Sequence, residues 1–308
     1  MNNKLTDNSR ILVTGAAGNI GAVGRHLTKM LIDKGHQVRG LVRKDDERAE
    51  GLRQLGAEVM IGDLTDLLSM HKAIKGCSRI YFSMSVSASY LEATVNVAAV
   101  ARYYGVEAFV NMSQMTVAEM SITETTDSPQ QKLHWLAEQV LEWSGLPVIT
   151  VRPTAFMEGL FLTMAAPGIR NNNELALPLG ESKTSPISSI DTASAVAEIL
   201  DNPIPHIGNV YNLTGYESAD LNHYAAIFSE VLGRKIQYRD VPLSSWTQTL
   251  VKFGATPHLA KHLATMAKLH AEGRYDRMTD DLFKLTGKQP INMYDFVKLH
   301  ADEFAQTK

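Results

Sequence analysis

Cysteine is nearly absent from this chain, since Cys77 is the only one among 308 residues. A lone thiol can form neither an internal disulfide nor a cysteine-rich metal site. Long hydrophobic runs are missing as well, and no stretch approaches the ~20 apolar residues of a membrane span. The opening MNNKLTDNSR contains no apolar stretch. We therefore expect no signal peptide, no membrane partner and a cytoplasmic location.

Strong charge of either sign is also lacking. The formal net charge is −3, which argues against broad electrostatic binding of nucleic acid. The ten histidines are scattered without a His-Glu-x-x-His spacing, so we expect no metal. Hydrophobic residues make up 44% of the chain and charged residues 20%. This composition is typical of a globular protein with an ordinary core.

What the chain does have is a ladder of glycines, Gly15, Gly18, Gly21 and Gly24, after the apolar run ILV. A strand, a glycine turn, a helix and a second strand are typical of a dinucleotide site, where backbone N–H groups meet the pyrophosphate. We assign the sharp turn to the first glycine, close approach to the phosphates to the second, and helix packing to the third. The fourth has no such role, so either the turn is longer than usual or the helix starts late.

Short β-branched runs alternate with helical stretches through the first half of the chain. The predicted strands are 10–14, 37–42, 58–61, 79–83, 108–112 and 148–151, and the predicted helices are 20–34, 47–55, 66–75, 89–104 and 130–144. This alternation predicts an α/β fold, a Rossmann-type doubly wound parallel sheet that binds its ligand at the carboxyl ends of the strands.

The rhythm changes after residue 153, where helical segments dominate. Asn171-Asn172-Asn173 and Pro178 suggest a turn that leads into a short hairpin. We predict a Rossmann domain over 1–153 and a smaller, mainly helical substrate or cap lobe over 154–308. The chain can also cross between these two lobes.

The end of the second predicted strand carries no carboxylate, because Val42 is followed by Arg43 and Lys44. An acidic residue near this point usually holds the ribose hydroxyls of NAD, whereas an arginine can bind a 2′-phosphate through two hydrogen bonds. We therefore predict that Arg43, supported by Lys44, favours NADP(H) over NAD(H). The alternative is a solvated basic side chain at a strand end. Asp63 would lie near the adenine.

The other predicted cofactor contacts come from the glycine turn and from the ends of the remaining strands. The loop 83–89 is richer in hydroxyls than a plain connection requires, so it either lines the nicotinamide end or caps the next helix. The full set is Gly15, Ala17, Gly18, Asn19, Ile20, Gly21, Arg43, Lys44, Asp63, Leu64, Ser83, Met84, Ser85, Asn111, Met112 and Pro153.

Several segments together resemble one family. TGAAGNIG, VRGLVR, the pair Gly62-Asp63 and SGLPVITVRPTAFMEGL are similar to NmrA-like proteins, which are atypical short-chain dehydrogenases/reductases. Segments 189–193 and 208–215 match the C-terminal half of that family, so the resemblance covers nearly the full chain. It implies a Rossmann domain that binds NADP(H) or NAD(H), with a small C-terminal lobe. Ala22-Val23-Gly24 look inserted relative to the family pattern.

Ordinary members of that superfamily use a serine and a Tyr-x-x-x-Lys pair, in which the tyrosine donates a proton to the substrate. The resemblance places the serine at Ser113, and it puts Gln130 and His134 at the tyrosine and lysine positions. Glutamine cannot act as a general acid near neutral pH, so the ordinary mechanism is not supported. His134 either gives a proton, holds the ribose hydroxyls, or is a plain helix histidine. These three are the candidate catalytic residues.

Two functions therefore stay open. The first is a reductase that moves hydride from NADPH to a small aromatic, electron-poor acceptor such as a quinone or an azo compound, with water able to supply the proton. The second is a redox sensor that binds NADP(H) without turnover and acts through a protein partner. The resemblance allows both, because the family contains dye and quinone reductases as well as regulators. A sugar-nucleotide epimerase is disfavoured, because it depends on Tyr-x-x-x-Lys.

Overall fold

The computed structural model describes residues 10–18 and 22–306. The chain divides into two compact units, each assembled from three segments. Unit 1 contains Met1–Gln114, Leu133–Arg152 and Thr192–Tyr211. Unit 2 contains Met115–Lys132, Pro153–Asp191 and Asn212–Lys308.

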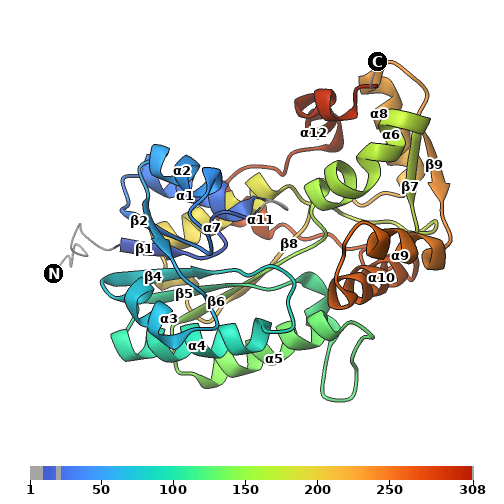
Figure 1. The fold of residues 1–308 in the computed structure, drawn as a ribbon. Coiled ribbons are helices and arrows are strands. Elements are labelled where there is room, and N and C mark those ends of the chain that lie inside the picture. The colour runs from blue at the N-terminus through green and yellow to red at the C-terminus, as the bar shows by residue number, and fades with distance from the viewer. Residues whose placement is uncertain (1–9, 19–21, 307–308) are drawn as a thin grey trace. The chain divides into compact units, whose positions relative to one another are not determined.

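A seven-stranded sheet has the strand order β3-β2-β1-β4-β5-β6-β8 (Figure 1). The strands are β1 (Arg10–Val13), β2 (Val38–Val42), β3 (Glu58–Ile61), β4 (Cys77–Phe82), β5 (Ala108–Met112), β6 (Val148–Pro153) and β8 (Val210–Leu213). Every pairing from β3 across to β6 is parallel. The order reverses between β1 and β4, which is the switch point where doubly wound sheets bind ligands. The predicted Rossmann-type fold is confirmed.

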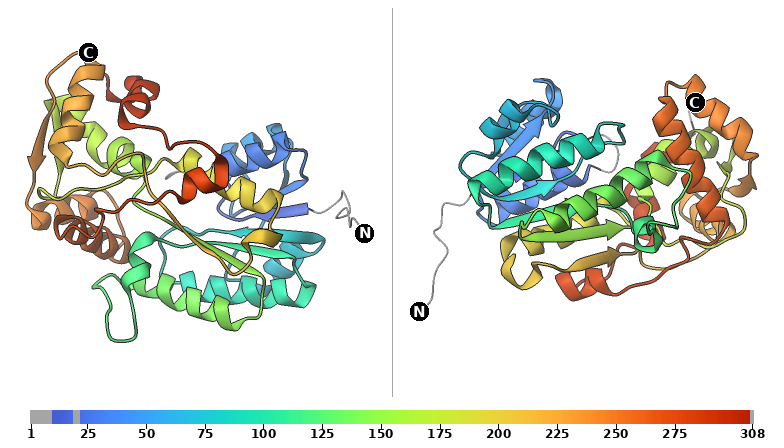
Figure 2. Two further views of the ribbon diagram at one scale, coloured as in Figure 1. Left: turned by 180° about the vertical axis from the view of Figure 1, so that it is seen from behind. Right: turned by 90° about the horizontal axis from the view of Figure 1, so that it is seen from below.

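Helices cover both faces of this sheet (Figure 1). They are α1 (Val23–Asp33), α2 (Glu47–Gln54), α3 (Leu67–Ile74), α4 (Tyr90–Tyr104), α5 (Pro129–Trp143) and α7 (Ser189–Asp201). The helices α1 and α2 lie on one face and α3 and α4 on the other, and α4 runs beside α5 (Figure 2). A strand covered on both faces has no solvent side, which is why Ile11, Leu12 and Val13 are completely buried.

Unit 2 is mainly helical and contains a small sheet of its own. Its helices are η1 (Met115–Glu119), η2 (Glu158–Ala165), α6 (Ala166–Asn172), α8 (Leu221–Leu232), α9 (Leu243–Lys252), α10 (Pro257–Ala271), α11 (Asp281–Thr286), α12 (Met293–Leu299) and η4 (Ala301–Phe304). Its core gathers large aromatic side chains, among them Phe161, Tyr224 and Phe228.

The prediction of a hairpin near residues 171–178 is wrong. Asn173 does reverse the chain, with φ at 57° at the end of α6. The strand that follows, β7 (Glu174–Leu177), pairs in parallel with the distant β9 (Gln237–Asp240). A parallel pair needs a long crossover, and nothing local in the sequence identified its partner.

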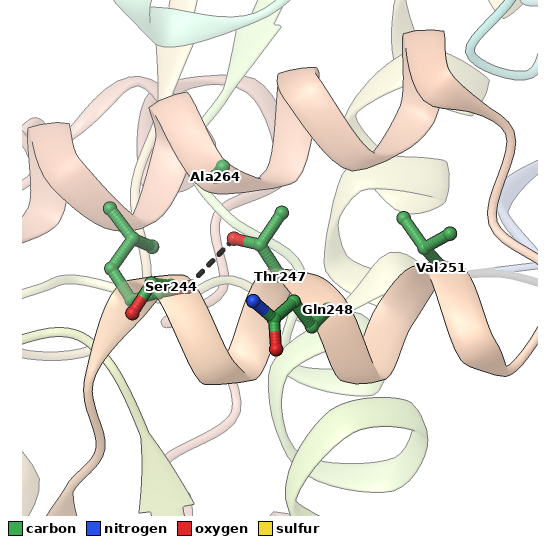
Figure 3. Close-up of a pocket in the computed structure, with 6 residues that line it drawn as sticks. Ser244, Thr247, Gln248, Val251 and Ala264 are labelled. Carbon is green, nitrogen blue, oxygen red and sulfur yellow. Dashed lines mark hydrogen bonds between the residues drawn. The ribbon is translucent and has the colours of Figure 1, made fainter.

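A groove with a volume of about 690 Å³ lies along α9 and α10 (Figure 3). Its lining residues are Leu243, Ser244, Thr247, Gln248, Val251 and Ala264. The Thr247 hydroxyl donates to the carbonyl of Leu243 within its own helix. The lining is therefore mainly apolar, with polar side chains at Ser244, Thr247 and Gln248 and no acidic or basic residue. Within residues 10–18 and 22–306, no helix combines the length and the apolar character needed to cross a membrane.

Candidate dinucleotide site

In the glycine turn after β1, backbone segments approach one another closely. Gly15 has φ at +65°, which side chains rarely adopt, and a Cβ there would lie 3.1 Å from the carbonyl oxygen of Ser83. The Gly18 N–H closes the turn by donating to the Gly15 carbonyl at 3.1 Å. The Ala17 carbonyl accepts from the Arg48 guanidinium at 3.4 Å. The predicted contacts Asn19, Ile20 and Gly21 lie outside the described residues.

Gly24 has a role that the sequence reasoning did not give it. Helix α1 begins at Val23, not near residue 20, and follows Ala22 in the left-handed region with φ at 48°. The helix therefore starts late, which was one of the two alternatives. A Cβ on Gly24 would lie 2.6 Å from the Gly15 carbonyl oxygen and 2.8 Å from Cα of Ala16. Gly24 is thus a glycine that lets α1 pack against the turn, the role predicted for Gly21.

A side chain links the carboxyl ends of β1 and β4. The Thr14 hydroxyl donates to the Ser83 carbonyl and accepts from the Ser83 N–H, both at 2.8 Å. Ser83 and Met84 are half-buried and Ser85 is exposed. The hydroxyl-rich loop therefore leaves from a fixed point beside Gly15, at the switch point of the sheet.

The end of β5 presents buried polar groups with no partner. Asn111 is 1% exposed and Ser113 is 5% exposed. Within the described part of the chain, neither amide atom of Asn111 nor the hydroxyl of Ser113 has a hydrogen-bond partner. Met112, between them, is buried and accepts a hydrogen bond from Tyr90 through its carbonyl.

Native proteins pair nearly all buried polar atoms, so each exception calls for an explanation such as a ligand. A dinucleotide would satisfy this one, because its ribose and amide groups donate and accept hydrogen bonds. The glycine turn lies at the same edge of the sheet, where backbone N–H groups would meet the pyrophosphate. The residues at this edge of the sheet, which we call the β1–β5 edge (Gly15, Gly24, Ser83, Asn111 and Ser113), therefore fit such a group.

At the end of β2, Arg43 extends into solvent with 77% of its side chain exposed, and its guanidinium lies 3.2 Å from the Asp63 carboxylate. The pKa of Asp63 is lowered, chiefly because the Thr65 N–H and hydroxyl donate to its carboxylate and also because Arg43 is near. Lys44 is exposed, and the Leu64 carbonyl accepts from the Asn96 amide. An exposed guanidinium held at one point by a carboxylate has donors left for an anion.

Gln130 and His134 lie one turn apart on α5, but their neighbours differ. Gln130 is 1% exposed, and its side-chain oxygen lies 2.8 Å from Nε2 of His258 on α10. An amide oxygen only accepts, so His258 carries a proton on Nε2. His134 is half-buried, with its ring against Tyr90. Pro153 is the buried last residue of β6.

A second histidine joins the start of α5 to α10. Nδ1 of His262 lies 2.9 Å from the hydroxyl of Ser128, which also accepts from the Gln131 N–H at 3.1 Å. Burial lowers the pKa of His262 to about 4, so its ring is neutral at pH 7. We call Ser128, Gln130, His258 and His262 the α5–α10 junction, which is joined by the contact of the Gln130 oxygen with His258 and that of the Ser128 hydroxyl with His262.

The sequence model of the NmrA-like family matches residues 7–297. The chain belongs to the NmrA-like family. This NmrA-like chain is 28% identical over 296 residues to the NAD(P)H azoreductase of Xenophilus azovorans, which covers 96% of this chain and 99% of that one. It is also 28% identical over 295 residues, covering 96% and 99%, to a (4-alkanoyl-5-oxo-2,5-dihydrofuran-3-yl)methyl phosphate reductase of Streptomyces griseus.

Its fold also matches the solved structure of an NADPH-dependent quinone oxidoreductase of Escherichia coli complexed with NADPH. The TM-score is 0.82 at 22% identity, with 94% of this NmrA-like chain and 99% of the other covered. At that identity the match establishes the fold. That structural neighbour is complexed with NADPH.

Sequence reasoning missed the contacts of three residues in this NmrA-like chain. The spacing of the glycines drew attention to Gly21, although only the start of the helix could identify Gly24. Tyr90 fell inside the predicted helix 89–104, with no motif around it. His258 lies far along the chain from Gln130, so no local pattern connects the two.

Proposed function

We propose that this protein is an NADPH-dependent reductase of quinone- or azo-like, electron-poor acceptors. The observation that carries the proposal is the pair of buried, unpartnered polar side chains at the β1–β5 edge, Asn111 and Ser113. Similarity over nearly the whole chain to an NAD(P)H azoreductase and to a second reductase supports the reaction class.

When bound, the reduced nicotinamide supplies one hydride to the acceptor. The acceptor takes up that hydride and one proton, and so becomes a hydroquinone or a hydrazo compound. The chain's own part is to bind and orient. Asn111 and Ser113 would offer hydrogen bonds at the nicotinamide end, and the glycine turn would hold the pyrophosphate through backbone N–H groups.

The proton must come from something other than a helix tyrosine. The helix α5 reads PQQKLHWLAEQVLEW and contains none. In our proposal His134, which is half-buried, or solvent supplies the proton, and Ser113 orients the acceptor. Gln130 then has no catalytic part, since its oxygen is engaged by His258.

We further propose that Arg43 favours NADPH over NADH by binding the 2′-phosphate, because its guanidinium is 77% exposed at the end of β2. Removing one charge-assisted contact to a phosphate should weaken NADPH binding by about tenfold to a hundredfold. NADH binding should change little. Titrations of Arg43→Gln with both cofactors, beside Lys72→Gln on the exposed surface of α3 as a control, measure this difference.

The activity is tested by following NADPH oxidation at 340 nm with a panel of quinones and azo dyes, with NADH in parallel. We expect oxidation that depends on the acceptor and disappears in Ser113→Ala combined with His134→Ala. Tight NADPH binding without acceptor-dependent oxidation at any pH between 5 and 9 would overturn the reductase. A sensor would then be supported by unequal affinities for NADP⁺ and NADPH.

A further inference from the structure

Tyr90 connects two of the proposed functional residues. It is the first residue of α4 and is completely buried. Its ring lies against the imidazole of His134, with centroids 4.1 Å apart and planes tilted by 44°. Its hydroxyl donates to the carbonyl of Met112 at 3.1 Å. One side chain thus contacts His134 through its ring and the residue before Ser113 through its hydroxyl.

Packing alone does not require a tyrosine at this position. The ring lies in an apolar cluster with Phe82, 5.8 Å away, where a phenylalanine would bury as much hydrocarbon. A buried hydroxyl needs a partner, and the one it has is the backbone at the end of β5. Burial also raises the pKa of the Tyr90 hydroxyl well above its usual range. It therefore keeps its proton and acts as a donor, and it is no acid for the substrate.

The charged side chain on the same face of α5 as His134 is already paired. Glu138 lies one turn after His134, and its carboxylate accepts two hydrogen bonds from the Arg152 guanidinium. This ion pair holds Glu138 toward β6. The ring of Tyr90 is the surface against which the half-buried imidazole rests.

We propose that Tyr90 is the positioning residue for His134. The ring restricts the orientation of the imidazole, and the hydroxyl fixes that ring relative to Met112 and Ser113. The inference rests on the proposed reductase, in which His134 meets the acceptor. A proton donor must be held within hydrogen-bond reach of its target, and Tyr90 would set that reach without touching cofactor or substrate.

A double-mutant cycle tests this role. Four proteins are compared: wild type, Tyr90→Leu, His134→Ala and the double variant. For Tyr90→Leu we expect kcat to fall by about tenfold to a hundredfold, with the acceptor KM and the NADPH Kd near wild type. In the His134→Ala background, Tyr90→Leu should cause little further loss, because it acts through the histidine. Tyr90→Phe keeps the ring and should retain activity within about fivefold.

Two measurements separate positioning from a general loss of packing. Phe109→Leu is the matched control, since it removes a ring from the same core cluster and Phe109 packs on Phe82 at 5.9 Å. Its kcat should stay near wild type. The ¹H–¹³C signals of the His134 ring should shift in Tyr90→Leu and keep their position in Tyr90→Phe. If Tyr90→Leu does not fold, Tyr90→Met takes its place because its flexible side chain fills more of the space.

Additive losses in the cycle, or an equal loss in Phe109→Leu, would overturn the positioning role. The ring signals need no turnover, so they remain decisive if wild type reduces no acceptor. If the His134 signals shift in Tyr90→Leu but the wild type reduces no acceptor, the contact between Tyr90 and His134 is supported and the reductase is rejected. Unchanged His134 signals in Tyr90→Leu would reject the positioning role itself.

Discussion

The β1–β5 edge and the α5–α10 junction are both rich in buried polar side chains, but they use them differently. At the β1–β5 edge, Asn111 and Ser113 have side-chain atoms without a partner in the described residues. At the junction, Gln130 meets His258 at 2.8 Å and Ser128 meets His262 at 2.9 Å. Polar groups that bond to one another stabilise a fold, whereas polar groups left without a partner reduce its stability unless a ligand binds. We therefore propose binding for the first region and a structural role for the second.

Acid should destabilise the protein through the α5–α10 junction, and this is the largest effect that we expect. The pKa of His262 is about 4 in the folded protein, below its usual 6.5. The stability that the neutral His262 ring contributes to the fold is therefore complete above pH 6.5. It is lost as the pH falls toward 4, because the unfolded chain takes up the proton first. Over that range the free energy of unfolding should fall by about 3 kcal/mol for this residue.

Urea unfolding between pH 7 and pH 4 measures this loss. His262→Asn should flatten the dependence by up to about 1.4 kcal/mol per pH unit. Identical slopes in wild type and His262→Asn would show that the buried histidine does not control the acid sensitivity.

At the β1–β5 edge, Gly24→Ala should have the next largest effect. The added Cβ would meet backbone atoms of Gly15 and Ala16 at 2.6 and 2.8 Å, and backbone cannot move aside as a side chain can. We expect a loss of about 1–3 kcal/mol in stability, and NADPH affinity lower by at least about tenfold because the turn shifts. Gly51→Ala in α2 is the matched control, since nothing lies within 4 Å of its Cβ. It should gain up to about 1 kcal/mol.

Asn111→Leu sharpens the comparison, because it should separate stability from binding. Replacing an unpartnered buried amide by an apolar group of similar size should leave the free energy of unfolding unchanged or raise it by about 1 kcal/mol. NADPH affinity should fall by about tenfold, the loss of one or two hydrogen bonds. Thermal unfolding without ligand and an NADPH titration give both quantities. A clear loss of ligand-free stability would mean that the amide is part of the fold.

Gln130→Leu should give the opposite result, with the smallest effect. It leaves the Nε2–H of His258 without an acceptor, which should destabilise the protein by about 1 kcal/mol. NADPH affinity should stay within about twofold. Gln130→Glu keeps an acceptor at the same place and is the control. If Gln130→Leu abolishes turnover while stability holds, Gln130 belongs to the catalytic residues after all.

The sheet was predictable because its signal is local and repeated. The strands Glu58–Ile61 and Ala108–Met112 match the prediction residue for residue. A short apolar run between glycine and polar turns is typical of a strand in a parallel sheet. The start of α1 was not predictable in the same way. Gly18, Gly21 and Gly24 have the same spacing, and only the packing of a helix against a particular backbone atom distinguishes them.

The sequence predicted that Arg43, Ser83 and Asn111 lie at the ends of strands, and they do so at β2, β4 and β5; their contact with a cofactor stays a prediction. Contacts between distant parts of the chain were not predictable. Tyr90 contacts His134 across two helices, and β7 pairs with a strand far along the chain. Such contacts depend on which elements meet in space, and the sequence around each partner carries no mark of the other.

The link between Thr14 and Ser83 has a consequence for recognition. Its two hydrogen bonds join the residues that directly follow β1 and β4, and so hold these two strand ends together. A binding surface that is already rigid loses little conformational freedom when a ligand arrives, so less of the contact energy is spent on ordering the protein. We therefore expect ligand affinity at the proposed site to depend on a hydroxyl that does not itself touch the ligand.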